Sequence, residues 1–453
     1  MKAWRWCGQG LAALFLVVSW HNPGTGATPE SSNRVLPAVR GASSCAAMAC
    51  HGSIRPAAPN LFPSNVLRNE HTTWVTQDKH ANAYQVLFSK RSQLIAQKLT
   101  GGKVPAHKDA RCLACHATPS LDPLAKDGRT VTLRSDGVSC EACHGPADLW
   151  LAAHTQAGWR DASPDFKAQY GMTVLKDLDR RAAVCVGCHV GAPAKDGLPG
   201  RDVNHDLIAA GHPRLNFEFA AFLANVPPHW AEDTTGAFAA RTWAVGQVVA
   251  AKAALDLLES RARLSKAHPD LHPWPEFSEY HCFSCHHDLA DQAWRKDRRD
   301  PTVPPGAPPW GSWYFALTLP MAGALAPAGA DSLKQHLPRL RAEMVKPLPD
   351  RDKAAAEAAQ AASALARWIQ AQPDARTLDG AVARRLIGSF KSPDAVTSWD
   401  EAAQLYLALQ PLNQSWGGLA PRDQLDLLYQ KLTYPRNYDS PKGFDPGRLV
   451  GGH

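Results

Sequence analysis

Ten of the eleven cysteines in this chain form five close pairs, and a histidine directly follows the second cysteine of every pair. Histidine accounts for only 19 of the 453 residues, so five such placements are not a chance pattern. The sets are Cys45/Cys50/His51, Cys112/Cys115/His116, Cys140/Cys143/His144, Cys185/Cys188/His189 and Cys282/Cys285/His286. C-x-x-C-H is the attachment motif of c-type haem: two thiols add to the vinyl groups and the histidine becomes the proximal ligand of the iron.

Four of the motifs have the standard spacing: CLACH (112–116), CEACH (140–144), CVGCH (185–189) and CFSCH (282–286). Paired C-x-x-C is also the spacing of zinc ribbons, but zinc would not require a histidine at the next position every time. A redox motif of the thioredoxin type would occur once, near a βαβ pattern. Haem is therefore the favoured interpretation of all four motifs.

The first pair, in CAAMACHG (45–52), has four residues between its cysteines instead of two. A short disulfide between Cys45 and Cys50 is the alternative, because exported proteins commonly oxidise their cysteines. His51 nevertheless stands in register with the other motifs, and a longer loop can bulge without displacing either sulfur. We therefore predict five covalently attached haem c groups.

Each iron can take a second axial ligand, and histidine is the more plentiful candidate. Only four methionines remain after Met1, and methionine ligation would raise the haem potential, so bis-histidine ligation predicts low potentials. A histidine on an apolar face is more often a core residue, but five haems must be covered. The favoured distal ligands are His80, His154, His205 and His212.

The surroundings of these histidines support that choice. His80 lies in a segment (74–88) that is predicted to form a helix, with Tyr84 and Leu87 on its face. His154 ends DLWLAAH (148–154), and His205 begins a short helical piece. His212 precedes Pro213, which can open a following helix. His71, His229 and His281 remain open, with a core or surface role favoured for each taken alone.

The N-terminus has the pattern of a cleaved secretory signal. Lys2 and Arg5 precede an apolar run (11–20) and small residues end at TGA (25–27), so residues 1–27, with Cys7, are predicted to be removed. No later segment has the roughly 18 uninterrupted apolar residues of a membrane span. We expect a periplasmic or otherwise exported protein with no transmembrane segment in the mature chain.

The mature chain is predicted to have four parts. They are a flexible lead (28–44), a haem-bearing domain (45–295), a proline-rich linker (296–325) and a helical C-terminal region (326–453). Helices are expected over 242–264, 352–372, 398–409 and 422–432, the third with a capping box from Ser398 to Glu401. The C-terminal region is either a helical appendage packed on the haem domain, which is favoured, or a docking module for a redox partner.

The formal charge of +7 does not indicate a nucleic-acid partner. Loss of Lys2 and Arg5 leaves +5, and five ferric haems with ionised propionates contribute about −1 each, which brings the holoprotein close to neutral. Many basic side chains are then expected to pair with propionates.

The motifs together resemble the multihaem cytochrome c-554 family. The matching pieces are CHG of the first motif, the segment from Trp74 to Ala81, CLACH, CEACHGP with His154 downstream, and CVGCH, over roughly residues 41–192. The resemblance implies a mostly α, loop-rich fold with its core built largely around closely packed haems. It also implies periplasmic electron transfer, in the archetype alongside hydroxylamine oxidation, and places His80 and His154 at positions that look like distal ligands. The longer first motif, the fifth motif and the C-terminal region depart from the family's pattern.

Two functions follow. The first is an electron carrier whose mostly bis-histidine haems pass single electrons to or from a redox partner protein. The alternative is a multihaem oxidoreductase in which one iron lacks a distal ligand and acts on a small nitrogen or sulfur species. That enzyme would need an open iron with histidine or arginine nearby. The surplus of histidines favours the carrier.

Overall fold

The computed structural model describes residues 38–57, 66–119, 133–195, 197–230, 236–282, 285–286, 303, 307–311, 313–325, 327–388, 396 and 398–433. All described residues lie in one compact unit, Pro37–His453. The predicted signal peptide, much of the predicted lead and most of the first half of the predicted linker lie outside the described residues.

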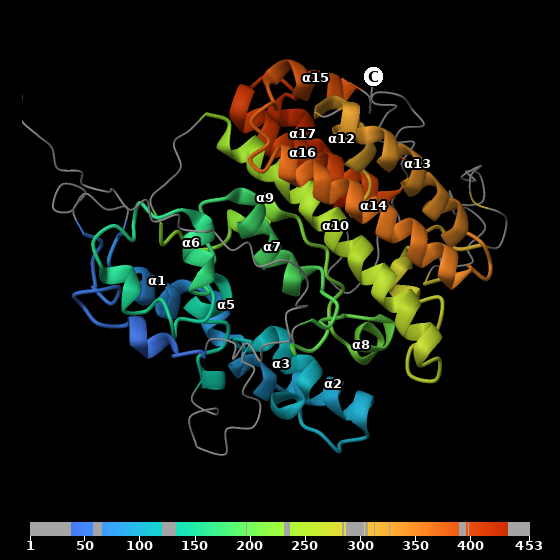
Figure 1. Ribbon diagram of the computed structural model, residues 1–453. Helices are drawn as coiled ribbons and strands as arrows, with labels where there is room; N and C mark the ends of the chain where they lie inside the picture. Colours follow the sequence, from blue (N-terminus) through green and yellow to red (C-terminus); the bar gives the residue numbers. More distant parts are fainter. Residues whose placement is uncertain are drawn as a thin grey trace, which may run out of the picture. The chain divides into compact units, whose positions relative to one another are not determined.

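The part of the chain that carries the first four motifs is built from short helices and long connections (Figure 1). Its α-helices are α1 (Glu70–Gln77), α2 (Lys90–Thr100), α3 (Ala110–His116), α5 (Cys140–His144), α6 (Pro164–Gln169), α7 (Leu178–His189), α8 (His205–Ala210) and α9 (Phe219–Leu223). Single 3₁₀ turns are η1 (Ala42–Cys45), η2 (Lys79–Asn82), η3 (Gln85–Phe88), η4 (Ala106–Lys108), η5 (Ala153–Thr155) and, before the fifth motif, η6 (Phe277–Glu279). The described residues pair only in three isolated β-bridges, so the prediction of a mostly helical fold is confirmed.

Longer helices follow in the second half of the chain. They are α10 (Phe238–Ala267), α12 (Thr318–Leu325), α13 (Pro327–Met344), α14 (Arg351–Ala371), α15 (Gly380–Gly388), α16 (Trp399–Trp416) and α17 (Arg422–Leu432). The four helices predicted from the sequence are confirmed as α10, α14, α16 and α17. Ser398 caps α16 as expected, because its hydroxyl accepts the backbone N–H of Glu401 at 3.3 Å.

Helix α10 is the centre of the largest apolar core. It packs along α14 and against α16, and also against α7 and α9 (Figure 1). Trp243, Leu255 and Leu258 on α10 are fully buried in this core. Helix α12, which begins inside the range predicted as a linker, also belongs to it. The fourth haem motif, at the end of α7, is therefore anchored on the same core as the C-terminal helices.

Among the described residues, the chain before α7 has little apolar core of its own. Its buried side chains form two small clusters, one around Tyr84 and Leu87 and one around Trp150 and Trp159. A segment of this length needs more buried apolar surface than these clusters supply, because side-chain burial must offset the entropy of ordering the backbone. This composition fits the prediction that attached haems form much of the interior here.

The predicted helix over 74–88 is wrong. Helix α1 ends at Gln77, and Asp78 takes an extended conformation in which its carboxylate accepts the backbone N–H of His80. A short aspartate side chain that binds its own backbone competes with helix propagation. The segment continues as two 3₁₀ turns, and Tyr84 and Leu87 are still buried.

No helix opens at Pro213. Helix α8 ends at Ala210, Gly211 has a φ of +122°, and the next helix, α9, starts only at Phe219. Glu218 caps α9 by accepting the backbone N–H groups of Ala220 and Ala221. Pro213 therefore lies in the connection between α8 and α9, and the cap at Glu218, five residues later, was not evident from the sequence.

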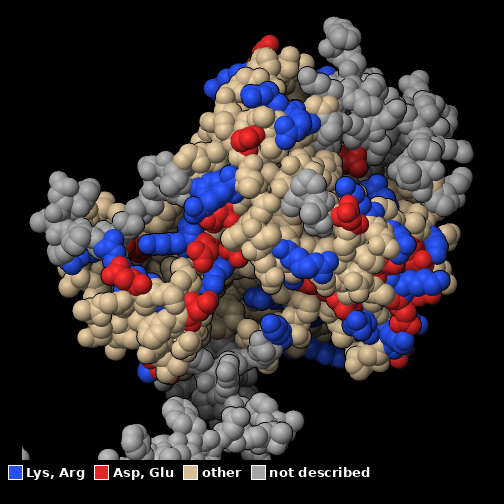
Figure 2. Space-filling model, turned by 45° about the horizontal axis from the view of Figure 1, so that its top comes forward, with Lys and Arg blue, Asp and Glu red and all other residues tan. Residues whose placement is uncertain are grey.

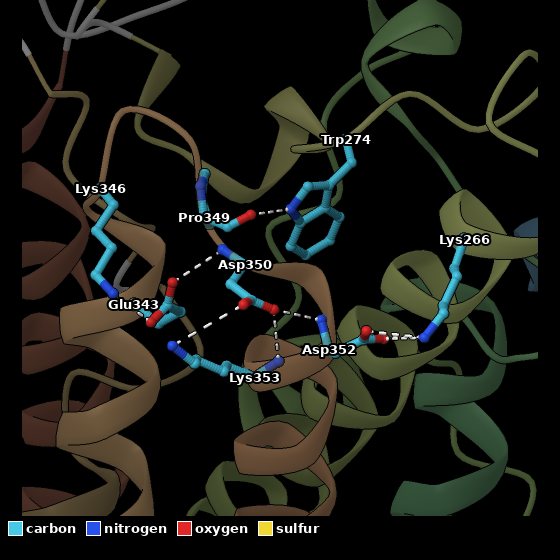
Figure 3. Close-up of polar contacts among 8 residues, drawn as sticks. All are labelled: Lys266, Trp274, Glu343, Lys346, Pro349, Asp350, Asp352 and Lys353. Atoms are coloured by element: carbon cyan, nitrogen blue, oxygen red, sulfur yellow. Dashed lines mark hydrogen bonds and ion pairs between the residues drawn. The ribbon is translucent and has the colours of Figure 1, made fainter.

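Polar contacts connect the turn between α13 and α14 to the end of α10 and to the segment that follows it (Figure 3). The carboxylate of Asp350 caps α14 by accepting the N–H groups of Asp352 and Lys353. Glu343 accepts the backbone N–H of Asp350, and Lys266 of α10 pairs with Asp352 at 2.8 Å. Trp274 donates its indole N–H to the carbonyl of Pro349 at 2.7 Å. The C-terminal helices are thus joined to the segment that leads into the fifth motif.

Among the described residues no helix is both long and apolar enough to cross a membrane. On the face drawn in Figure 2, lysine and arginine side chains are interspersed with aspartate and glutamate.

Candidate functional site: five cysteine–histidine motifs

Four of the five motif histidines each face a second histidine from a distant part of the chain. The centres of the two imidazole rings lie 6.1–6.4 Å apart in every case. The pairs are His51 with His154, His116 with His212, His189 with His80, and His286 with His205. All four histidines that the sequence selected as distal candidates are in these pairs, and whether they ligate iron stays a prediction.

The separation of the rings fits an iron between them. A metal–imidazole bond is about 2.0–2.1 Å, so two such bonds and two ring radii span about 6 Å. The planes of the two rings are nearly parallel in the His51–His154 pair, at 16°, and nearly perpendicular in the His80–His189 pair, at 81°. Rings in direct van der Waals stacking would lie closer together.

Hydrogen bonds at Nδ1 orient the rings. His51 is bound to the Glu70 carboxylate and His80 to the Asp78 carboxylate, both at 2.9 Å. His116, His154 and His212 donate Nδ1–H to backbone carbonyls, of Ala83, Leu151 and Pro213. In each ring this leaves Nε2 as the nitrogen for a metal, which is the usual arrangement around ligating histidines. The hydrogen bonds to Glu70 and Asp78 also raise the pKa values of His51 and His80.

His144 of the third motif differs from the other four. No facing histidine accompanies it within the described residues, and burial lowers its pKa to about 4. His229, His51, Glu70 and Arg181 are all close enough to His144 to interact with it electrostatically. His229 has the Nδ1 arrangement of the paired histidines, since it hydrogen-bonds the carbonyl of Pro227 at 3.2 Å. Arg181 lies over the ring of Trp230, 5.5 Å from its centre. The sequence had left His229 to a core or surface role, and no local signal connects it with a motif 85 positions earlier.

The ten motif cysteines are free thiols in the structure. The Cys45 side chain lies beside that of Cys140 of the third motif, and their interaction lowers the pKa of Cys45 to about 6. In the same way, Cys115 of the second motif contacts Cys188 of the fourth and lowers its pKa to about 6. Cys143 also lies within charge-interaction range of Cys185 and Cys188. Motifs 1 and 3, 2 and 4, and 3 and 4 are therefore neighbours.

Glycines allow two of the motifs to fold tightly. In the first motif, Cys50 and Gly52 both donate their backbone N–H to the carbonyl of Ala47, so the two extra residues form a compact turn. A Cβ on Gly52 would lie 1.9 Å from the carbonyl oxygen of Ala46. Gly145, after the third motif, has a φ of +83°, and a Cβ there would lie 2.1 Å from the carbonyl oxygen of Gly171. Only glycine fits either position, which explains the glycine after His51 and His144.

Groups around the motifs suit an attached haem. Phe222 and Phe277 are 38% and 61% exposed, although each packs against a histidine of this site. Exposed aromatic rings beside candidate ligands are the surfaces that a porphyrin would cover. Arg201 and Arg214 donate to Cys188 and Cys282 at 3.7 and 3.6 Å, and could pair with propionates. The residues present therefore fit the cofactor.

The fifth motif is framed by the C-terminal helices. Tyr280 donates its hydroxyl to the carbonyl of Met344 at 2.9 Å, and its backbone pairs with that of Trp310. His281 lies 3.3 Å from the carboxylate of Asp400 in α16. Glu276 accepts the backbone N–H of His205 at 2.8 Å, which ties the facing histidine to the same segment.

The motifs and their facing histidines are the arrangement expected of a c-type cytochrome. Comparison with known proteins agrees: residues 44–145 match the family described as Cytochrome c554 and c-prime. This match, over less than half of the chain, supports the cytochrome c554 family and with it covalently bound haem c and electron transfer. Neither a curated protein nor a solved structure matches the chain.

Proposed function

We propose that this protein is an exported pentahaem cytochrome that carries single electrons between redox partner proteins. The main support for this proposal is that four motif histidines each face a second histidine, at a separation that would fit an iron between the two rings. An iron with two protein ligands has no position for substrate and can exchange only electrons. The haems, when bound, supply this one-electron chemistry.

The chain's own residues have three tasks in this proposal. Paired cysteines would attach the haem, paired histidines would hold its iron, and acceptors such as Glu70 and Asp78 orient the imidazoles of His51 and His80. Histidine at both positions, without methionine, is expected to keep the potentials low.

The order of the motifs in space supports a continuous route. Thiol contacts place motif 1 beside 3 and motif 4 beside 2, and motif 3 lies near 4. The segment that holds His205 and His212 connects motif 5 with motif 2, since these residues face His286 and His116. We infer the sequence 1–3–4–2–5. Cys50 and Cys285, in the two terminal motifs, are the exposed cysteines of the ten, which suits electron entry and exit at those ends.

The first test is haem quantification with low-temperature electron paramagnetic resonance on the air-oxidised protein, matured in a host that attaches haem c. The carrier predicts five haems and low-spin signals for motifs 1, 2, 4 and 5. A count of four, with Cys45 and Cys50 unmodified by mass spectrometry, would remove the first motif from the assignment.

The third motif favours a second candidate function. His144 has no facing histidine among the described residues, while His229 and Arg181 lie within charge-interaction range. An open iron with these two side chains could bind a small anionic nitrogen or sulfur species, as the oxidoreductase alternative requires.

Nitrite or cyanide titration of the oxidised protein tests this candidate. A high-spin signal that one equivalent of ligand converts to low spin is expected if the third iron is open. His229→Ala should then weaken ligand affinity, whereas His107→Ala, at a histidine stacked on Phe88 away from this motif, should not. Five low-spin haems with no response to either ligand would exclude the enzyme.

Export is supported by the signal pattern at residues 1–27. N-terminal sequencing of the protein from a periplasmic fraction should begin near residue 28, and full-length protein retained in the cytoplasm would contradict export.

A further inference from the structure

The fifth motif borders a charged cluster to which the C-terminal region contributes one member. Asp400, the second residue of α16, is 2% exposed, and its carboxylate lies 3.3 Å from Nδ1 of His281, which is 4% exposed. His281 immediately precedes the attachment cysteine Cys282. Arg214 interacts electrostatically with Asp400 and contacts the sulfur of Cys282 at 3.6 Å. Asp400, which follows Cys282 by 118 positions in the sequence, thus directly faces His281 and Arg214, the neighbours of this cysteine.

Asp400 is held as an ionised group. Burial disfavours its charge, but His281 and Arg214 outweigh this and lower its pKa below the ordinary value, and the backbone N–H of Trp313 adds a hydrogen bond. Its place in the first turn of α16 also favours a negative charge. A buried charge that loses its partner is costly, so these groups constrain one another's positions.

The surrounding contacts leave the cluster little freedom to move. The backbone of His281 donates to the carbonyl of Pro309, and the hydroxyl of Tyr314 donates to the carbonyl of Leu215, next to Arg214. Ser398 caps α16 two residues before Asp400. The Asp400 carboxylate therefore reaches the motif from a fixed helix end and not from a mobile surface segment.

We propose that Asp400 is a positioning residue of the fifth haem site, which fixes His281 and Arg214 against Cys282 and sets the potential of that haem. The C-terminal helices are then part of this site. The inference rests on the proposed function because it requires haem at Cys282 and Cys285. A fixed negative charge near an iron stabilises the ferric form, which carries one more positive charge than the ferrous form.

The test is a redox titration of Asp400→Asn, which removes the charge and keeps the shape. We expect five haems, with the ferrous-to-ferric ratio of one couple raised at least tenfold at a given potential. For a one-electron couple this is a shift of about 59 mV upward. The affected couple is identified as the one that disappears from a Cys282→Ser/Cys285→Ser variant with four haems.

Asp352→Asn is the matched control. It removes the same charge from another C-terminal helix, but Asp352 is exposed and pairs with Lys266, so all five couples should stay in place. If Asp400→Asn does not accumulate, Arg214→Gln removes the opposite charge from the cluster and should lower the potential of the same couple.

Two results would overturn the inference: an unchanged fifth couple in Asp400→Asn or Arg214→Gln protein with all five haems, or an equal shift of every couple. Failure of the proposed function has a different signature. In that case Cys282 and Cys285 of the wild-type protein would be found without haem by peptide mass spectrometry, whatever the effect of the variants.

Discussion

At the scale of single residues, buried carboxyl groups behave according to their neighbours. Asp400 faces His281 and Arg214, which lower its pKa. Glu218 is just as buried, at the start of α9, but its partners are two neutral backbone N–H groups. Burial therefore dominates there and raises the pKa of Glu218 to about 7. Two acidic side chains in similar interiors are thus expected to carry different charges near neutral pH.

Glu218 should make the stability of the protein pH-dependent. Its folded-state pKa lies above the unfolded value, so its contribution is fully present below about pH 4.5 and is lost as the pH rises through about 7. The Glu218→Gln variant cannot ionise. The difference between its free energy of unfolding and that of the wild type should therefore rise by about 3 kcal/mol over this window.

Urea unfolding of both proteins at several pH values measures this difference. Asp165→Asn serves as the control, because Asp165 is exposed and its removal should give a difference that does not change over the window. A constant difference between Glu218→Gln and wild type would contradict the raised pKa.

At the scale of elements, helix ends determine where functional groups lie. Asp78 ends the first helical segment and turns the chain so that His80 meets His189. Gly211 ends α8, whose first residue is His205, and the chain then presents His212 to His116. Ser398 starts α16 and so fixes the direction from which Asp400 reaches the fifth motif.

Ser398→Ala should destabilise the protein by about 1 kcal/mol, because the N–H of Glu401 loses its side-chain acceptor. Ser398→Thr retains a hydroxyl and should be close to wild type. Urea midpoints of the holoproteins provide the comparison, and equal midpoints for the alanine and threonine variants would show that the cap does not stabilise α16.

At the scale of the whole molecule, two parts of the chain are stabilised differently. The helices from α10 to α16, with α7 and α9, share one large apolar core. The chain before α7 has two small clusters and exposed apolar side chains such as Ile54 and Phe88. Haem is expected to replace side chains as the interior of this part.

Protein produced without haem attachment should therefore lose its structure unevenly. Limited proteolysis is expected to cut first within residues 66–176 and to leave a fragment that contains α10 and α14, which mass spectrometry can identify. The holoprotein should resist in both parts. Equal resistance of haem-free and holoprotein over residues 66–176 would show that side chains alone hold that part.

The sequence by itself determined which cysteines and histidines make up the motifs. It also determined where the propensity for long helices is strong. It also indicated His80, His154, His205 and His212 as candidate ligands, because five haems must be covered and histidines are plentiful whereas methionines are few. Their role as ligands stays a prediction. The end of α1 before Asp78 and the start of α9 only at Phe219 were not predicted from the sequence. In both places a side chain that hydrogen-bonds nearby backbone overrides the apolar period.

Only the tertiary structure decided which partners meet. His80 faces a motif 109 positions later, and His116 faces a histidine 96 positions later. Such pairings depend on how helices pack and where they end, which no local spacing records. The same applies to His144, which no histidine faces in the described part of the chain, and to Asp400, which reaches from the C-terminal helices to the fifth motif. The physical reason is that attachment needs only neighbours along the chain, whereas axial ligation and charge pairing need neighbours in space.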